Sequence, residues 1–134
     1  MDFTQRIDVP ADMDTAIDAI TKALKDEGFG VLTRIDVQDT LEQKLHVDVG
    51  AQVILGACNP QLAHRALEAD PRVAALLPCN VVVRADGDHT IIEALDPKLI
   101  ASIPENDSLL PVAEEAGTRI RAALDAVVDT LGAL

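Results

Sequence analysis

Two segments that join a hydrophobic run to a cysteine constrain the fold of this chain more than any other feature. The first reads V-I-L-G-A-C-N-P over residues 53–60, and the second reads L-P-C-N-V-V-V over residues 77–83. Continuous apolar runs are typical of buried strands, and Asn before Pro is typical of a helix start. We therefore predict strands at Gln52–Cys58 and Cys79–Ala85, separated by a helix over Pro60–Ala69. The first of these strands is expected to be central and covered on both faces.

The spacing of apolar residues along the sequence predicts the remaining strands and helices. Alternating patterns and turn signals predict three further strands, at residues 3–9, Gly30–Ile35 and Thr90–Ala94. Apolar residues three or four apart predict three further helices, at residues 13–27, 37–45 and about 110–133. Residues 70–76 predict a short turn, and residues 96–107 predict a helical turn followed by a loop.

This order of elements favours an α+β fold, with helices packed on one face of a largely antiparallel sheet. Two long amphipathic helices suffice to cover that face. The other face must meet solvent or another subunit, and a chain rich in Val and Leu favours self-association. At 134 residues and without a low-complexity linker, the chain is expected to form one domain over residues 1–134.

Composition argues against several classes of function. Aromatic residues make up 1% of the chain, so there is almost nothing on which nucleic acid bases can stack. The formal net charge of −12 repels phosphate backbones and anionic membranes, so we expect no nucleic acid and no membrane partner. The acidity is compatible with a saline environment, a basic partner or cation binding. Without a signal-peptide pattern or a transmembrane run, the expected location is cytoplasmic, where both cysteines stay reduced.

The two cysteine segments, together with G-F-G-V at residues 28–31 and with Ala63, Ala66 and Leu67, resemble the bacterial family called domain of unknown function 302. The resemblance covers about residues 10–100. It implies a compact fold with a curved antiparallel sheet, similar in topology to one half of the TATA-binding protein, and a dimeric state. It does not imply DNA binding. Gln52 stands where many relatives carry an aromatic residue.

Two cysteine–asparagine pairs are the leading candidates for a ligand-binding site: Cys58 with Asn59, and Cys79 with Asn80. Cys58 precedes a helix N-terminus, where backbone N–H groups favour a thiolate, whereas Pro60 and the negative net charge oppose it. Buried free cysteines also serve simply as small hydrophobic residues. Capping explains Asn59, whereas Asn80 has no local explanation.

His64 adds a candidate metal ligand. It lies six residues after Cys58 on the predicted helix, so Cys58, Cys79 and His64 would form a three-ligand set with an open fourth position. Such a set suits a soft metal. The spacing lacks the closely spaced cysteine or histidine pairs that are typical of zinc sites.

Three other polar groups have simpler explanations than a site. His46 and Asp48 resemble an acid–base pair, but no nucleophile stands beside them, which favours a solvated loop. The D-G-D-H sequence at residues 86–89 is what a hairpin turn requires. Arg34 and Lys44 offer positive charge to an anion, although a solvated surface explains them as well.

We therefore expect a small homodimeric domain that binds a small molecule or a soft metal near the two cysteine junctions. One alternative is a thiol-dependent redox enzyme that uses Cys58 and Cys79. A second is an interaction module that dimerises through the open sheet face or the C-terminal helix. The sequence contains no phosphate-binding loop, dinucleotide fingerprint or nucleophile elbow, so the familiar enzyme classes gain no support.

Overall fold

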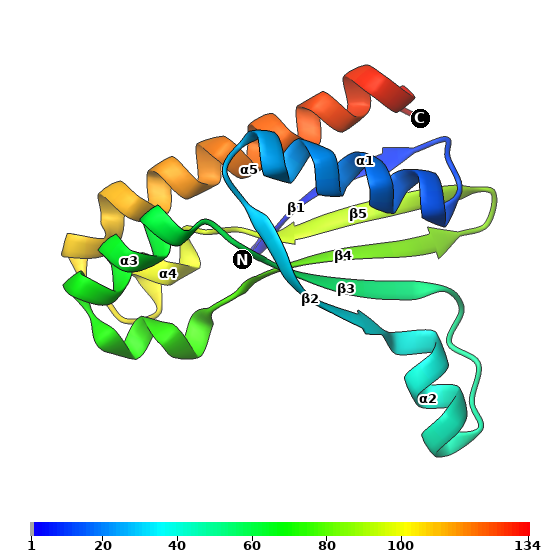
Figure 1. The fold of residues 1–134 in the computed structure, drawn as a ribbon, viewed down its shortest axis with the longest axis horizontal. Coiled ribbons are helices and arrows are strands. Elements are labelled where there is room, and N and C mark those ends of the chain that lie inside the picture. The colour runs from blue at the N-terminus through cyan, green and yellow to red at the C-terminus, as the bar shows by residue number, and fades with distance from the viewer. Residues whose placement is uncertain (1) are drawn as a thin grey trace.

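Five antiparallel strands form one open sheet in this computed structural model, which describes residues 2–134. The strand order across the sheet is β1-β5-β4-β3-β2, so β1 and β2 lie at opposite edges. The strands are β1 (Thr4–Val9), β2 (Gly30–Asp36), β3 (Gln52–Cys58), β4 (Cys79–Asp86) and β5 (His89–Leu95). The predicted α+β class is confirmed (Figure 1).

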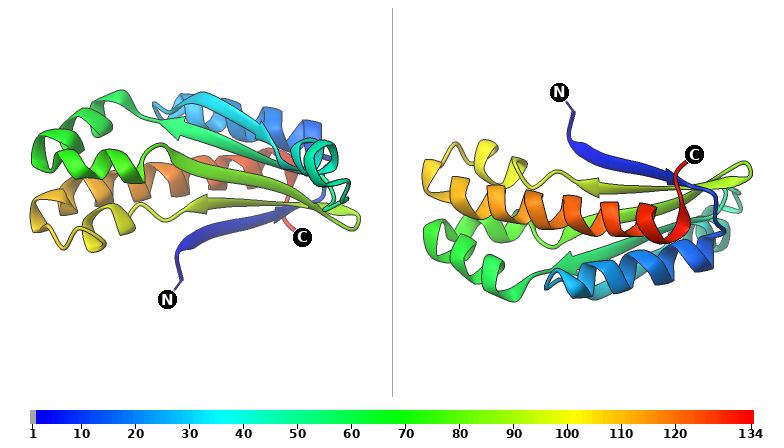
Figure 2. Two further views of the ribbon diagram at one scale, coloured as in Figure 1. Left: turned by 90° about the horizontal axis from the view of Figure 1, so that it is seen from below. Right: turned by 90° about the horizontal axis from the view of Figure 1, so that it is seen from above.

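Two long helices, α1 (Met13–Asp26) and α5 (Leu110–Leu131), cover one face of the sheet and leave the other open (Figure 2). At one end of the sheet lie α3 (Pro60–Ala69), α4 (Leu99–Ser102) and two 3-10 turns, η1 (Pro71–Leu76) and η2 (Asp107–Leu109). The helix between β2 and β3, α2 (Val37–Leu45), projects away from the body of the molecule (Figure 1). No helix within residues 2–134 is long and apolar enough to cross a membrane.

The first helix begins and ends where its sequence predicts. The side chain of Asp12 accepts a hydrogen bond from the Thr15 N–H at 2.8 Å and so caps the N-terminus. At the other end Gly28 has a φ of +86°, and the Phe29 N–H donates to the Leu24 carbonyl at 2.8 Å. This left-handed stop returns the ring of Phe29 to the core.

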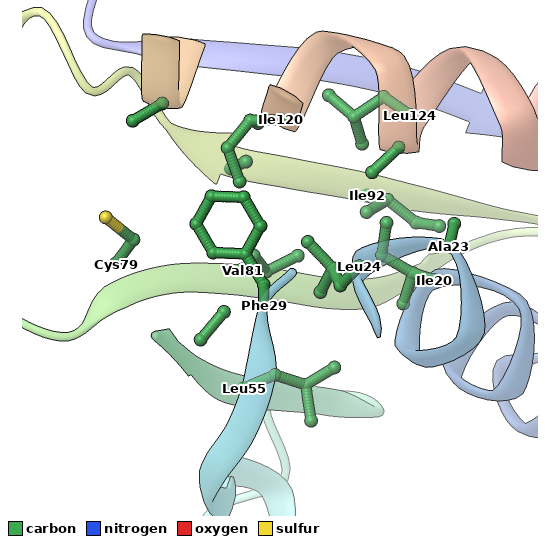
Figure 3. Packing of buried hydrophobic residues seen from close by; sticks show 14 of the residues in the cluster. Ile20, Ala23, Leu24, Phe29, Leu55, Cys79, Val81, Ile92, Ile120 and Leu124 are labelled. Atoms are coloured by element: carbon green, nitrogen blue, oxygen red, sulfur yellow. The ribbon is translucent and has the colours of Figure 1, made fainter. Parts of the chain in front are cut away.

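The core lies between the sheet and its two covering helices. Figure 3 shows Phe29 packed among aliphatic side chains of the strands, of α1 and of α5, with Cys79 at the margin of the cluster. Among the largest fully buried side chains are Leu24, Leu55 and Ile120. Because aromatic residues are scarce, branched aliphatic side chains supply most of the buried apolar area, which is the main favourable contribution to folding.

Two details of the sheet differ from the expectation. β3 is an interior strand that pairs with β2 and β4, but only one of its faces is covered by helices, and Ile54 is half-buried on the open face. Phe3 precedes β1 and is 57% exposed, because the start of this strand diverges from α5 (Figure 2). Between residues 96 and 107 the structure has the one-turn helix α4 and then a loop up to the start of η2, as predicted.

Candidate functional site

The first cysteine junction is held in place by Asn59. Its side-chain oxygen accepts from the Leu62 N–H at 3.2 Å, and Pro60 occupies the first turn of α3, as the sequence predicts. The Asn59 amide also lies against Gly28, where an added Cβ would approach its Nδ2 to 2.9 Å. Asn59 therefore connects the start of α3 to the end of α1, and its polar atoms are largely used for structure.

Cys58 and Cys79 lie beside a common apolar cavity. This cavity has a volume of about 20 Å³ and is lined by Phe29, Asn59 and aliphatic residues of α3, α4 and α5 as well as by the two cysteines. A volume of this size accommodates about one water molecule. The two junctions thus come together as predicted, but no small molecule fits between them in this conformation.

The two thiols differ in their surroundings. Burial, and then the proximity of Cys58, raise the pKa of the Cys79 thiol to about 11. Cys79 is therefore a neutral thiol at physiological pH and a poor nucleophile. Cys58 is half-buried, and both cysteines are free rather than joined in a disulfide.

The structure separates His64 from the cysteines. The His64 side chain is 76% exposed, and its Nε2 lies 3.0 Å from the Glu68 carboxylate one turn later. On α3 the buried positions are Leu62 and Ala66, and His64 lies between them on the outward side. Within residues 2–134 no group of three or more His, Cys, Asp or Glu side chains is placed to hold a metal ion, so the three-ligand set is not assembled here.

Asn80 is also separated from the other candidate residues. Successive side chains of a strand point to opposite faces, so Cys79 is buried under the helices while Asn80 is exposed on the open face. The predicted four-residue site therefore divides into Cys58, Asn59 and Cys79 at the cavity and Asn80 elsewhere. Asn80 pairs in register with Gly56 of β3.

The other polar groups considered from sequence have structural roles. Asp48 accepts hydrogen bonds from the Gly50 N–H at 2.9 Å and the Gln38 amide at 3.3 Å, and these bonds lower its pKa. His46 ends α2 in a left-handed conformation with a φ of 56°. Gly87, with a φ of +63°, forms the tip of the hairpin between β4 and β5, as predicted.

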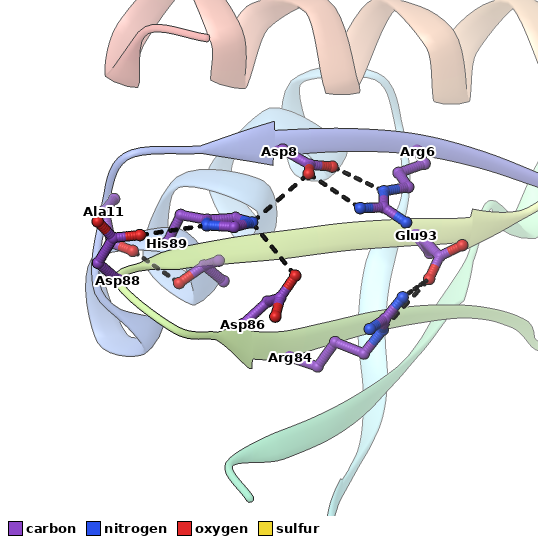
Figure 4. A network of polar contacts seen from close by, with 9 residues as sticks. Arg6, Asp8, Ala11, Arg84, Asp86, Asp88, His89 and Glu93 are labelled. Carbon is purple, nitrogen blue, oxygen red and sulfur yellow. Dashed lines mark hydrogen bonds and ion pairs between the residues drawn. The ribbon is translucent and has the colours of Figure 1, made fainter. Parts of the chain in front are cut away.

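The open face carries a charged network of which the sequence analysis singled out only the D-G-D-H residues (Figure 4). Arg6 binds Asp8 through two hydrogen bonds of 2.7 and 2.9 Å, and Arg84 donates to Glu93 at 2.7 Å. The Arg84 guanidinium holds the pKa of Glu93 below its usual value. His89 lies 3.4 to 3.6 Å from the nearest oxygens of three carboxylates, those of Asp8, Asp86 and Asp88.

A second feature missed from sequence is the arm formed by β2, α2 and the following loop, residues 30–51. None of the nine residues of α2 is buried. Five large apolar side chains of the arm are between 43% and 68% exposed: Leu32, Ile35, Leu45, Val47 and Val49. The sequence shows a weak apolar stripe in this segment. Only the structure reveals that nothing within residues 2–134 covers these apolar side chains.

A third feature is a groove of about 1400 Å³ between β1 and α5. Thr4, Gln5 and Arg6 line it from the strand, and α5 contributes small residues such as Ala113 and Gly117. The Gln5 Oε1 atom is buried and has no hydrogen-bond partner within residues 2–134. The groove depends on β1 being an edge strand, which local sequence patterns do not reveal.

Fold and surfaces together define a class of protein: a small α+β domain with one helix-covered sheet face, one open face and a projecting arm. The family model described as "Domain of unknown function DUF302" matches residues 5–127. The chain belongs to this family, and the match extends beyond the residues that carried the resemblance, into α5.

A solved structure supports the same assignment. An uncharacterized conserved protein DUF302 from Bacillus stearothermophilus is 32% identical to this chain, with a TM-score of 0.88. The likeness covers 94% of this chain and 98% of that one. No match was found among curated proteins.

Proposed function

We propose that this chain is a homodimeric interaction module, in which a second copy covers the open sheet face and the arm of residues 30–51. The observation that carries this proposal is the concentration of uncovered apolar side chains on the arm. Ten large apolar residues are exposed within residues 2–134, and five of them lie between Leu32 and Val49. Exposed apolar side chains concentrated in one segment are typical of an interaction site.

The helix of the arm supports the same conclusion. α2 has nine residues, and an isolated helix of this length is marginal in water. Most helices in proteins are stabilised by packing an apolar face against another element. Because α2 buries no residue against its own chain, a partner that covers Leu41 and Leu45 would supply that packing.

Charge favours a second copy as the partner. The whole chain carries a net charge of −12, so two copies repel each other over most of their surfaces. On the open face part of this charge is neutralised, because Arg6 pairs with Asp8 and Arg84 pairs with Glu93. A two-fold interface that buries this face brings together surfaces whose negative charge is already partly compensated.

The cysteine cavity gives less support to the two other functions. Its volume of about 20 Å³ leaves no room for a small molecule, and the raised pKa of Cys79 disfavours a thiolate that would resolve a disulfide. The two thiols do lie at one cavity. However, a function at this cavity leaves the exposed apolar side chains of the arm unexplained, whereas an interaction module explains them.

Size-exclusion chromatography with light scattering of charged variants tests the proposal. We expect Ile35→Glu and Leu45→Glu to elute as monomers, because each places a carboxylate in the apolar interface. Ile103→Glu is the matched control: Ile103 is 59% exposed but lies outside the arm, so this variant should elute like the unmodified chain. Equal elution masses for all three variants would argue against an interface on the arm.

A further inference from the structure

The outer edge of β1 has backbone groups available for pairing. Within residues 2–134 β1 pairs only with β5. Phe3 accepts a hydrogen bond from the Asp96 N–H on the β5 side at 2.8 Å, whereas the Asp8 carbonyl accepts one from Leu134 of the C-terminal tail at 3.4 Å. Because backbone direction alternates along an antiparallel strand, residues 4, 6 and 8 direct their N–H and C=O groups away from β5.

These outward groups are only partly satisfied. The Thr4 N–H donates to the Asp2 side chain at 3.3 Å, and the tail occupies the carbonyl of Asp8. The N–H and carbonyl of Arg6 and the carbonyl of Thr4 have no backbone partner within residues 2–134. An extended chain placed beside Thr4–Arg6 would complete these bonds, as a natural sixth strand does.

The groove supplies space for such a chain. It lies directly beside Thr4, Gln5 and Arg6, and its volume of about 1400 Å³ far exceeds that of the cysteine cavity. Figure 2 shows the start of β1 diverging from α5. Residues of both elements line the groove. Ala113 and Gly117 on α5 carry no long side chain that would fill it.

Charge indicates the kind of chain that fits. Five acidic residues line the groove against three basic ones. All three basic side chains are already paired, as Arg6–Asp8, Lys98–Asp96 and Arg121–Asp125. Asp2 and Glu114 form no ion pair within residues 2–134, so the groove presents unneutralised negative charge to a ligand.

We propose that the β1 edge binds an extended basic peptide segment of another protein by strand addition at Thr4–Arg6. Main-chain hydrogen bonds give the affinity, alternate small apolar side chains of the peptide face Ala113 and Gly117 of α5, and the net negative charge of the groove attracts its basic side chains. The pairing edge of β1 is at the opposite edge of the sheet from the arm. Arg6 and Glu93 line the groove and also belong to the charged network of the open face.

Fluorescence anisotropy with a labelled peptide of alternating valine and lysine, about eight residues long, tests the proposal. The variants to compare are Arg6→Pro and Arg6→Ala, which carry the same charge. Proline removes only the outward N–H, and it is tolerated on edge strands because no bond to β5 is lost. We expect Arg6→Pro to bind about tenfold more weakly than Arg6→Ala, through loss of main-chain pairing.

A second probe covers the case in which Arg6→Pro fails to fold, which circular dichroism would reveal. The same peptide with all its amides N-methylated keeps its charge and loses its donors, so it should not bind the unmodified protein. Equal binding by both peptides, or by both Arg6 variants, would mean that attraction is by charge alone and would overturn the proposal. Absence of saturable binding by the unmethylated peptide would overturn it as well.

Discussion

Close packing around Gly56 joins β2, β3 and the loop before β4 at a single residue. Gly56 pairs in register with Thr33, and an added Cβ would overlap the Thr33 hydroxyl and come within 2.9 Å of Pro78 Cγ. The G-A-C part of the first cysteine segment therefore has a packing role that is separate from the thiol.

Gly56→Ala should lower the free energy of unfolding by about 1–3 kcal/mol, because a well-packed site cannot accept the extra methyl group without shifts. Gly30→Ala is the matched control, since no atom lies within 4 Å of its added Cβ. Urea denaturation measures the free energy of unfolding of both variants. Removing the obstructing hydroxyl with Thr33→Ala should recover part of the loss in the double variant, and a purely additive result would contradict this explanation.

The buried thiol of Cys79 makes the free energy of unfolding depend on pH in the alkaline range. Its thiol has a pKa of about 11 in the folded chain, against an ordinary value of 9.0. Below pH 9 the thiol is protonated in both states, whereas between pH 9 and 11 the unfolded chain loses the proton first. The free energy of unfolding should therefore fall over this interval, by about 2 kcal/mol.

Urea denaturation of the unmodified chain and of Cys79→Ala over this pH interval separates the cysteine from other groups. The variant lacks the thiol, so its stability should decline less steeply with pH. Parallel curves for the two proteins would show that the buried thiol does not have the raised pKa.

At the residue scale, sequence predicted those features that local chemistry determines. The capping role of Asn59 follows from residue type and position, and it is observed. The approach of Cys58 to Cys79 also followed from the short helix between them. The outward position of His64 depends on which side of α3 meets the core, and that is decided by its packing neighbours rather than by spacing from Cys58.

Unlike the other helices, α2 forms without burying any of its residues. Its ends are well defined: the Asp36 side chain accepts from the Asp39 N–H at 2.9 Å, and His46 closes the last turn. Capping of this kind contributes about 1 kcal/mol, which is modest for a helix with no packed face. The stability of α2 should therefore depend on what covers the arm.

Hydrogen exchange of the α2 amides, followed by mass spectrometry at several protein concentrations, tests this dependence. We expect exchange over residues 37–45 to slow as concentration rises, since the dimer covers the helix. The amides of α1, whose buried face packs within its own chain, serve as the internal control and should not change. Exchange in α2 that is independent of concentration would contradict a covering second copy.

Most elements were predictable because their signals are local. β3 and α3 occupy the residues expected from the apolar run and the Asn-Pro junction. The prediction that both faces of β3 are covered was wrong, since an apolar run indicates burial but does not reveal what packs on each face of a strand. Ile54 illustrates this limit, because it is apolar and yet only half-buried on the open face.

For the whole molecule, the strand order determines which surfaces are available. Placing β1 and β2 at the two edges creates the groove beside β1 and leaves the arm beside β2 uncovered. Both surfaces arise from long-range pairing between residues such as Arg6 and Glu93, far apart in the sequence. The sequence predicted one open sheet face and self-association, but the arm and the groove required the three-dimensional arrangement.

The central claim is that a second copy covers the open face and the arm. Sedimentation equilibrium of the unmodified chain over a dilution series measures this most directly, because it gives molar mass without an assumption about shape. We predict twice the mass of one chain at high concentration and a return towards the mass of one chain on dilution. A mass of one chain at every concentration would contradict the account.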